Sequence, residues 1–465
     1  MVGMLAAMPP PAPHFAQPDD ARFRVRGDAC PGALRLHRAD DGALARVRVP
    51  GGVLTWEQAD GLRKLAGRLG DGELHLTSRG NVQLRGLDAG CGGELASRMS
   101  EMGLLPSALH ERVRNVVASP LSGIDGRGAR DVRPWLVALD ALVCASEEAA
   151  GLSGRFLFAL DDGRGDVDAL GADVTLRARR DGAAELRIGT LESVAVVPAE
   201  EAPGAALLAA RVFLEAAGAQ AGSGSGSADG SGSGSGGGAG AGAWRVGELA
   251  GGAGPLLDEV VRRLGADGVS VAPGSTPVPG AAAPALGLVA GTGATDALSA
   301  GLPLGRADAA RWRALTDLAR DHGAGELRLT PWRGVVVPGV RRERAPAALD
   351  ALGAAGLVTA DRSPWTGTGA CIGRPGCAKS LADVRGDAAS ALPAAPPGDA
   401  LPVYWSGCER RCGHPRGDWV DVVAGPDGYQ VSVVRDGDRP EDPAHVAAEP
   451  AALAAAVAAA REPRR

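Results

Sequence analysis

Residues 43–87 combine two hydrophobic periodicities. Residues 43–49 alternate between apolar and polar side chains, which predicts a strand with one buried face. Thr55 and Gln58 have the spacing of a helix capping box, and a helical stripe of leucines follows at Leu62, Leu65 and Leu69. Glycines within residues 70–72 end this helix, and residues 73–77 and 82–87 have the pattern of two short strands around a turn. The segment therefore predicts the order strand, helix, strand, strand.

The same order returns 253 residues later. Residues 72–87 and 325–340 are identical at seven of sixteen aligned positions, without a gap. A second pair of fragments, residues 118–126 and 362–370, shares a Ser-Pro pair and a glycine three residues after the proline. We therefore predict two copies of one larger α+β unit. A cavity between pseudo-symmetric copies is where we expect a large ligand.

Residues 222–242 separate the two copies. Eleven of these 21 residues are glycine, and most of the others are serine or alanine. Such a composition cannot bury enough apolar surface to order itself. We predict a flexible linker at residues 221–243, and a disordered, proline-containing N-terminus at residues 1–20.

Composition narrows the class of protein. The chain has 465 residues, of which 45% are apolar, enough for about three domains. Its apolar runs reach about ten residues, short of the roughly 20 that span a bilayer, and no basic residue precedes the short apolar run at the N-terminus. A formal charge of −6 opposes non-specific nucleic-acid binding, while 47 of the 49 basic residues are arginines, which suit carboxylates. We expect a cytoplasmic protein that binds neither membranes nor nucleic acid.

Four of the seven cysteines form two pairs near the C-terminus. Cys371 and Cys377 enclose five residues, and Cys408 and Cys412 enclose three. Four thiolates complete the ligand set of a [4Fe-4S] cluster or of a structural zinc ion, and unligated core cysteines are a third interpretation. Zinc favours pairs two to four residues apart, so the five-residue gap favours the cluster. The three other cysteines, Cys30, Cys91 and Cys144, fit structural positions better.

The repeat and the cysteine spacing together resemble the sulfite and nitrite reductase superfamily. The resemblance rests on LTSRGNVQLRG at residues 76–86, RNVVASPLSGID at residues 114–125, and the two cysteine pairs. That superfamily has a pseudo-two-fold α+β fold with ferredoxin-like half-domains, and it couples a [4Fe-4S] cluster to siroheme beneath a set of basic residues. The resemblance implies that Arg79 and Arg114 are catalytic. It also implies four cluster ligands, Cys371, Cys377, Cys408 and Cys412, the last being the thiolate shared with siroheme.

Two segments depart from the reductase pattern. Reductases carry Leu-Pro-Arg-Lys-Phe-Lys where this chain has LSGRFL at residues 152–157, so Arg155 replaces one lysine and Leu157 the other. TPWRG at residues 330–334 also differs from the reductase pattern Thr-x-x-Gln-Asn. With GDACPG at residues 27–32 and GLPLGR at residues 301–306, these departures resemble the precorrin-3B synthase branch of the superfamily.

This branch implies an oxidoreductase of the monooxygenase type. Its members hydroxylate precorrin-3A at C20 with O2 and close a γ-lactone in aerobic cobalamin biosynthesis. They contain a [4Fe-4S] cluster, with a mononuclear non-haem iron proposed as a further cofactor. Binding the substrate carboxylates calls for arginines, and Arg85, Arg155 and Arg333 lie in or beside the repeated segments. No dinucleotide fingerprint follows a predicted strand, so we expect electrons from an external NADH-linked reductase.

The resemblance also divides the chain. The expected units are a ferredoxin-like half-domain at residues 21–105, a tetrapyrrole-binding domain at 106–220, a second half-domain at 244–355 and an iron-sulfur domain at 356–465. Three histidines near the motifs, His75, His110 and His414, are candidates for the mononuclear iron, without diagnostic spacing. For each arginine, a solvated surface position is the competing interpretation.

Two other functions remain open on the sequence. A siroheme-dependent sulfite or nitrite reductase is the alternative to precorrin-3B synthase, because most of the reductase motifs are retained. A non-enzymatic electron carrier or tetrapyrrole carrier is the third class. Siroheme is expected only for the reductase alternative.

Overall fold

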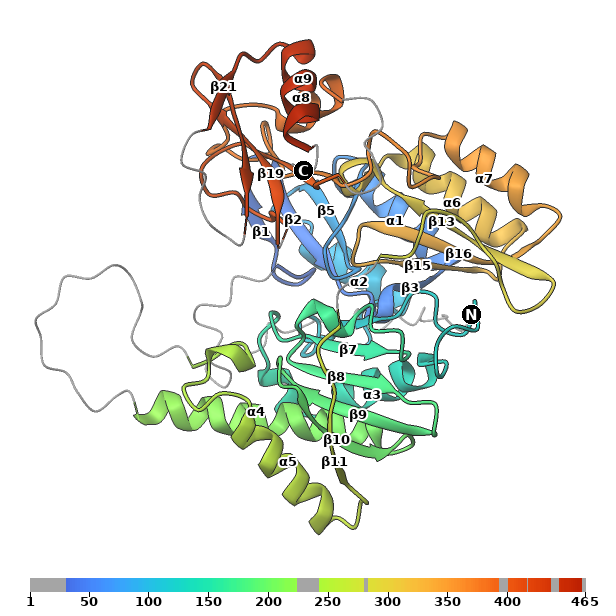
Figure 1. Ribbon diagram of the computed structural model, residues 1–465, viewed down its shortest axis with the longest axis vertical. Coiled ribbons are helices and arrows are strands. Elements are labelled where there is room, and N and C mark those ends of the chain that lie inside the picture. Colours follow the sequence, from blue (N-terminus) through green and yellow to red (C-terminus); the bar gives the residue numbers. More distant parts are fainter. Residues whose placement is uncertain are drawn as a thin grey trace, which may run out of the picture.

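The computed structural model describes residues 31–223, 242–279, 283–392, 400–415, 417–435 and 443–461. Four β-sheets with covering helices organise this part of the chain. In Figure 1 the blue and orange half-domains lie side by side, with the green sheet on one side of them and the red C-terminal sheet on the other. The predicted disordered N-terminus, Cys30 and most of the predicted linker lie outside the described residues.

The first half-domain is a five-stranded sheet covered by two helices. Its strands lie in the order β1 (His37–Ala39), β2 (Gly42–Val47), β5 (Val82–Leu87), β4 (Leu74–Leu76) and β14 (Arg306–Ala307). The helices are α1 (Trp56–Leu69) and α2 (Gly92–Glu101). Thr55 caps α1 as predicted: its Oγ1 accepts from Gln58 N at 3.2 Å, and its own N–H bonds to Gln58 Oε1 at 3.0 Å. Because Leu62 and Leu65 are buried, the predicted stripe faces the core.

The second half-domain repeats this arrangement. Its sheet has the order β12 (Gly287–Val289), β13 (Thr295–Gly301), β16 (Gly334–Arg341), β15 (Glu326–Leu329) and β3 (Val53–Thr55), with helices α6 (Ala309–Asp321) and α7 (Ala345–Ala354). Each half-domain lends the other one short edge strand, β3 to β15 and β14 to β4. The two half-domains share one core, in which the Trp312 indole N–H bonds to Ala59 O at 2.8 Å. The α+β duplication predicted from the repeat is confirmed.

A third sheet follows the first half-domain along the chain. Its strands lie in the order β11 (Ala272–Ser275), β10 (Ser193–Pro198), β9 (Ala183–Ile188), β8 (Val174–Ala178), β7 (Phe158–Asp161) and β6 (Val116–Ala118). It packs against α3 (Arg133–Ala145), α4 (Ala202–Ser223) and α5 (Gly254–Ala266). The predicted start of the second half-domain at residue 244 is therefore too early. α5 shares a core with α4, and β11 pairs with β10, so both elements complete this third sheet.

The C-terminal sheet has the same parallel core as the third sheet. It contains β17 (Thr368–Ala370), β18 (Val403–Ser406), β19 (Trp419–Gly425), β20 (Gly428–Val434) and β21 (Ala444–Val446), with α8 (Val384–Ser390) and α9 (Pro450–Arg461). β17, β18 and β19 run parallel, as β6, β7 and β8 do. The Ser-Pro fragments aligned from the sequence are not equivalent, because Ser119 follows β6 whereas Ser363 precedes β17.

α4 is an apolar core helix. Of the described helices, it alone has the length and composition to cross a bilayer, with a mean hydropathy of 1.2 over Ala202–Ala221, half of which is buried in the protein. Its alanines pack in one core with β8, β9 and α3. Its burial therefore comes from packing on the third sheet.

Candidate functional site

The cysteines of the predicted cluster come from the ends of two adjacent parallel strands. Cys371 follows β17 and Cys408 lies two residues after β18, so both leave the same edge of the sheet. Cys371 N donates to Trp405 O at 2.9 Å, and Gly407 N donates to the Cys371 sulfur at 3.2 Å. Burial raises the pKa of the Cys371 thiol, and this N–H donor opposes the rise. A backbone N–H aimed at a sulfur is the kind of contact that stabilises a thiolate ligand.

The other two cysteines lie in tight loops beside this edge. The backbone carbonyl of Cys377 accepts from Ser380 N at 3.0 Å, and that of Cys408 accepts from Arg411 N at 3.1 Å. The Tyr404 hydroxyl donates to Cys412 O at 2.7 Å. Cys412 is exposed, whereas Cys371, Cys377 and Cys408 are half-buried. One edge of the four-cysteine site therefore reaches the surface.

This donor set fits a cluster better than a single ion. Among the described residues, no three cysteine sulfurs lie within 4.8 Å of one another. A tetrahedral zinc with bonds of about 2.3 Å would bring its sulfurs to about 3.8 Å. A cubane spaces its four thiolates more widely, so the wider separation of these sulfurs disfavours zinc and is compatible with a [4Fe-4S] cluster.

The first half-domain clamps the Cys371–Cys377 loop. Arg85 pairs with Asp41 through two hydrogen bonds of 2.8 Å, and its Nη2 donates to Gly376 O at 3.1 Å. Asp40 Oδ2 accepts from Ala378 N at 2.5 Å. We expected Arg85 to bind substrate, but its side chain instead bonds to Asp41 and to the cysteine loop. The clamp was not predicted, because it joins residues more than 290 positions apart.

A polar chain runs from Cys371 to His75 on β4. Arg385 Nε donates to Cys371 O at 3.1 Å, and its Nη1 lies 3.1 Å from His75 Nδ1. His75 is 6% exposed, and its Nε2 lies 3.8 Å from carboxylate oxygens of both Asp71 and Glu73. Burial lowers the pKa of His75, and burial with the nearby Arg306 and Arg85 charges lowers the pKa of Arg385 to about 10.

Asp71 and Glu73, in the bend before β4, converge on His75 of that strand, but the three residues do not fit a metal ion. A guanidinium can only donate, so His75 Nδ1 accepts from Arg385 and Nε2 carries the hydrogen. A protonated Nε2 has no lone pair for a metal. Arg306 also pairs with Glu73 at 3.2 Å, and further positive charge surrounds the group. The three residues form a polar group beside the arginines instead.

The other two histidine candidates have structural environments. His110 is 3% exposed and bonded to Ser107 Oγ at 2.7 Å and Ser146 O at 2.8 Å. His414 stacks on Trp419 with ring centroids 5.2 Å apart, and its Nδ1 bonds to Pro415 O at 2.8 Å. Neither histidine converges with two other metal-ligating side chains of the described residues.

The predicted catalytic arginines occupy different environments. Arg79 Nη1 lies 3.5 Å from Gly154 O, the carbonyl that Arg48 Nη2 also contacts, at 2.8 Å. Arg114 is 6% exposed, bonded twice to Asp140 at 2.7 and 2.8 Å, and donates to Leu104 O. Arg114 is therefore held in an internal ion pair, in contrast to the predicted ligand role. Arg48, a buried arginine that sequence patterns did not single out, lies closer to residues 152–157.

The other two predicted substrate arginines, Arg155 and Arg333, also lie in different environments. Arg155 stacks on Trp244 at 5.2 Å and pairs with Glu248 at 3.4 Å, so residues after the linker hold it. Arg333 adopts a left-handed backbone with φ +58°, matching Gly80 in the first copy at φ +65°. A side chain in this region costs about 1 kcal/mol or more. No described carboxylate pairs with Arg333, whose charge acts on the Tyr404 hydroxyl beside the cysteines. Arg333 is the candidate best placed to meet an anionic ligand.

Comparisons with known proteins agree with this architecture. The nitrite/sulfite reductase ferredoxin-like half domain matches residues 36–95 and again residues 290–355. The chain is 26% identical to precorrin-3B synthase from a Sinorhizobium species over 437 residues, covering 88% of this chain and 83% of that enzyme. It is 34% identical to ferredoxin–nitrite reductase from Synechococcus elongatus over 128 residues, 26% of this chain and 25% of that enzyme.

A solved structure supports the fold over most of the chain. The NirA protein of Mycobacterium tuberculosis superposes with a TM-score of 0.61 and 18% identity, covering 87% of this chain and 78% of NirA. The two half-domain matches coincide with the two sheets that exchange edge strands. The NirA superposition covers more of the chain and extends to the two sheets that contain parallel strands. The chain therefore has two nitrite/sulfite reductase ferredoxin-like half domains within a nitrite/sulfite reductase-like fold, and it is similar to precorrin-3B synthase.

Proposed function

We propose that the protein is an O2-dependent, cytoplasmic oxidoreductase of the precorrin-3B synthase type. The reaction is hydroxylation of precorrin-3A at C20 with formation of a γ-lactone, a step of aerobic cobalamin biosynthesis. The similarity to the Sinorhizobium enzyme over most of both chains supports this assignment. In this proposal the cavity that holds siroheme in the reductases holds a related tetrapyrrole as substrate.

The observation that carries the proposal is the dispersal of the basic side chains. A reductase must gather several donors at one point to hold a small oxyanion. Here Arg114 is paired with Asp140, Arg155 is stacked on Trp244, and Leu157 stands where a lysine is expected. A tetrapyrrole carries its carboxylates around a wide edge and needs separated arginines instead.

Two groups of residues receive roles in substrate binding. Arg333, which has no acidic partner among the described residues, binds a substrate carboxylate through charge-assisted hydrogen bonds. Leu157 is 3% exposed in a small apolar cluster, and Trp332 of the TPWRG segment packs on that cluster. This apolar wall keeps water from the macrocycle. Arg79 and Arg48 hold the Gly154 carbonyl, so they orient the loop that leads into the wall.

The four cysteines form the electron-transfer part of the site. When bound, a [4Fe-4S] cluster supplies single electrons to the reaction. The exposed position of Cys412 gives an external donor, such as an NADH-linked reductase, a point of approach. The described residues contain no donor set that fits a mononuclear iron, and no role is assigned to one.

Cofactor content and anaerobic activity test this proposal. Protein purified without O2 should contain about four irons per chain and a broad absorption near 400 nm, without the red bands of siroheme. With an artificial electron donor, it should reduce neither sulfite nor nitrite.

The alternative function is a siroheme-dependent sulfite or nitrite reductase. The 34% identity to a nitrite reductase over 128 residues favours it. Bound siroheme together with robust anaerobic reduction of either anion would establish that alternative and remove the precorrin-3B synthase proposal. The fold and the cysteine arrangement would be unaffected.

A further inference from the structure

The two copies of the parallel-sheet unit allow a comparison within one chain. Ala118 pairs with Leu160 as Ala370 pairs with Trp405, so Ser119 is the counterpart of Cys371. Asp162 N donates to Ser119 Oγ at 3.1 Å, and Gly407 N donates to the Cys371 sulfur at 3.2 Å. In both copies, a backbone N–H donates to the side chain that follows the first parallel strand.

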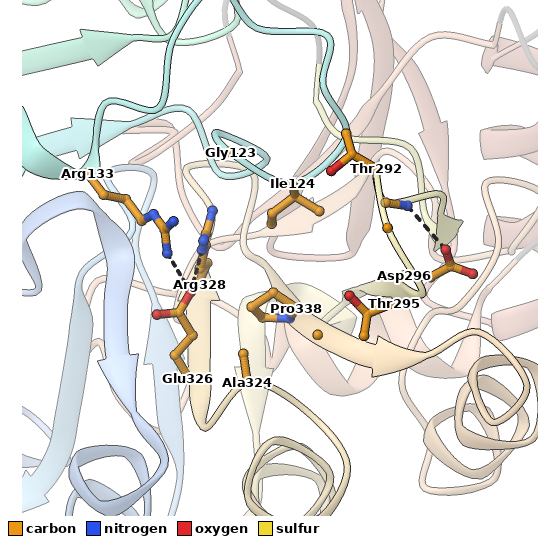
Figure 2. A pocket seen from close by; sticks show the side chains of 13 residues that line it. Gly123, Ile124, Arg133, Thr292, Thr295, Asp296, Ala324, Glu326, Arg328 and Pro338 are labelled. Atoms are coloured by element: carbon orange, nitrogen blue, oxygen red, sulfur yellow. Dashed lines mark hydrogen bonds and ion pairs between the residues drawn. The ribbon is translucent and has the colours of Figure 1, made fainter.

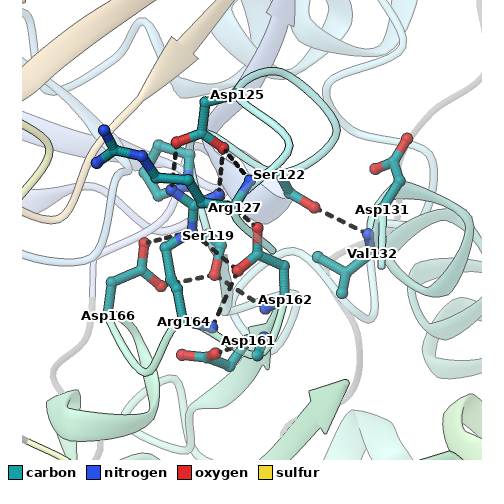
Figure 3. Close-up of polar contacts among 12 residues, drawn as sticks. Ser119, Ser122, Asp125, Arg127, Asp131, Val132, Asp161, Asp162, Arg164 and Asp166 are labelled. Carbon is teal, nitrogen blue, oxygen red and sulfur yellow. Dashed lines mark hydrogen bonds and ion pairs between the residues drawn. The ribbon is translucent and has the colours of Figure 1, made fainter. Parts of the chain in front are cut away.

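The counterpart of the cysteine site is filled by protein side chains. Ser119 and Asp125 are six residues apart, as Cys371 and Cys377 are, so Asp125 corresponds to Cys377. Figure 3 shows Arg164 inserted between Asp125 and Asp162, with ion pairs of 2.9 and 2.7 Å. The first copy therefore neutralises its acidic groups with an internal arginine.

A second arginine differs between the copies. Arg133 lies 14 residues after Ser119, and Arg385 lies 14 residues after Cys371. The residues just before the two arginines also correspond. Val132 and Val384 lie at the same distance from Ser119 and Cys371, respectively, and both are fully buried. Arg133 is 45% exposed and has two acidic neighbours, Asp131 at 2.7 Å and Glu326 at 3.9 Å. Figure 2 shows Arg133 beside Glu326.

Arg385 has lost these acidic partners. No carboxylate of the described residues forms an ion pair with it, although the Glu73 charge acts on it from a distance. Its hydrogen bonds go to the Cys371 carbonyl and to neutral His75. A desolvated guanidinium without a direct ion-pair partner is unfavourable. In the first copy Arg133 is balanced by acids, and the residue fourteen positions before it is the neutral Ser119. In the second copy the neighbouring residue is a cysteine of the cluster site.

We propose that the Arg385 guanidinium is the counter-charge of the iron-sulfur cluster and raises its reduction potential. The proposal rests on the cluster assigned in the proposed function. Reduction adds one electron to a group whose four thiolate ligands are already anionic. A cation fixed at the Cys371 backbone stabilises the reduced form more than the oxidised form, so removing it lowers the potential.

The test uses three full-length variants purified without O2. Arg385→Gln removes the charge, Arg385→Lys keeps it, and Arg133→Gln removes the pseudo-equivalent charge away from the cysteines. Iron content is measured first, and the potential is then taken from a dithionite titration followed by electron paramagnetic resonance. We expect Arg385→Gln to shift the reduced-to-oxidised ratio at fixed potential at least tenfold towards oxidised, which is 59 mV for one electron.

Each outcome decides the proposal. Arg385→Lys and Arg133→Gln should stay within threefold of the wild type. If Arg385→Gln loses iron while Arg385→Lys keeps both iron and potential, the charge requirement is still supported. A wild-type potential in Arg385→Gln, or an equal shift in Arg133→Gln, overturns the inference. Wild-type protein without iron would instead refute the cluster itself, and with it the proposed function.

Discussion

Replacing Gly407 with alanine should expel the cluster, because the added methyl group has no room. Its Cβ would overlap Ser380 Oγ and lie 2.7 Å from Ser380 Cβ. Ser380 cannot turn away without loss, since its hydroxyl donates to Ala382 O at 2.7 Å. Leu381 N also bonds to Gly407 O at 2.8 Å, which ties the two loops together. The methyl group must therefore displace backbone that positions Cys377 and Cys408.

The size of the effect follows from two contributions. Overpacking a tight site costs about 1–3 kcal/mol. Disturbing the Gly407 N–H bond to the Cys371 sulfur, 3.2 Å long, adds about 1 kcal/mol. A total of roughly 2–4 kcal/mol corresponds to a thirty- to thousand-fold weaker retention of the cluster.

Iron per chain and absorption near 400 nm after gel filtration measure this loss. Gly93→Ala is the matched control, because a Cβ there meets nothing within 4 Å. Adding Ser380→Gly to Gly407→Ala removes the overlapping side chain and should restore much of the iron. Wild-type iron content in the single variant would refute the geometric argument.

Three further predictions concern stability. Asp140→Asn leaves Arg114 buried without its ion-pair partner and should lower the free energy of unfolding by about 2–4 kcal/mol in urea, with the cluster spectrum unchanged; an unchanged urea midpoint would contradict the assigned pair. Burial and the Asp161 charge raise the pKa of Asp166 to about 7, so the folded state binds this proton more tightly than the unfolded state, whose pKa is 3.8. The stability contributed by this group should fall as the pH rises from about 4 to 7. In Asp166→Asn, the free energies of unfolding in urea at about pH 5 and pH 8 should therefore differ less than they do in the wild type. Thr55→Ala removes the cap of α1 and should cost about 1 kcal/mol in thermal unfolding, whereas an unchanged melting temperature would argue against the capping box.

Local patterns predicted the parts of the fold that depend on local interactions. The capping box at Thr55 and Gln58 and the leucine stripe of α1 were visible because both repeat within one helix. The exchanged strands β3 and β14 were not, since strands of three and two residues carry no periodicity. α5 and β11 follow the glycine-rich segment but complete the preceding sheet, a long-range pairing that composition does not reveal.

The candidate site shows the same division. Cysteine spacing and the family resemblance predicted the four ligands, because paired cysteines have specific chemistry. The roles of Arg85 and Arg114 depended on partners, Asp41 and Asp140, that no motif connects to them. Arg385 is one of 47 arginines, so only its contact with the Cys371 carbonyl separates it from surface residues.

Oxygen-dependent turnover of precorrin-3A is the most direct test of the central claim. Purified protein, an electron source and precorrin-3A are held without O2, then ¹⁸O2 is admitted and the product is analysed by mass spectrometry. The account predicts no consumption before O2 enters, and a product that then carries one ¹⁸O atom in the new hydroxyl group. Consumption of precorrin-3A without O2, or a product that lacks the label, would contradict it.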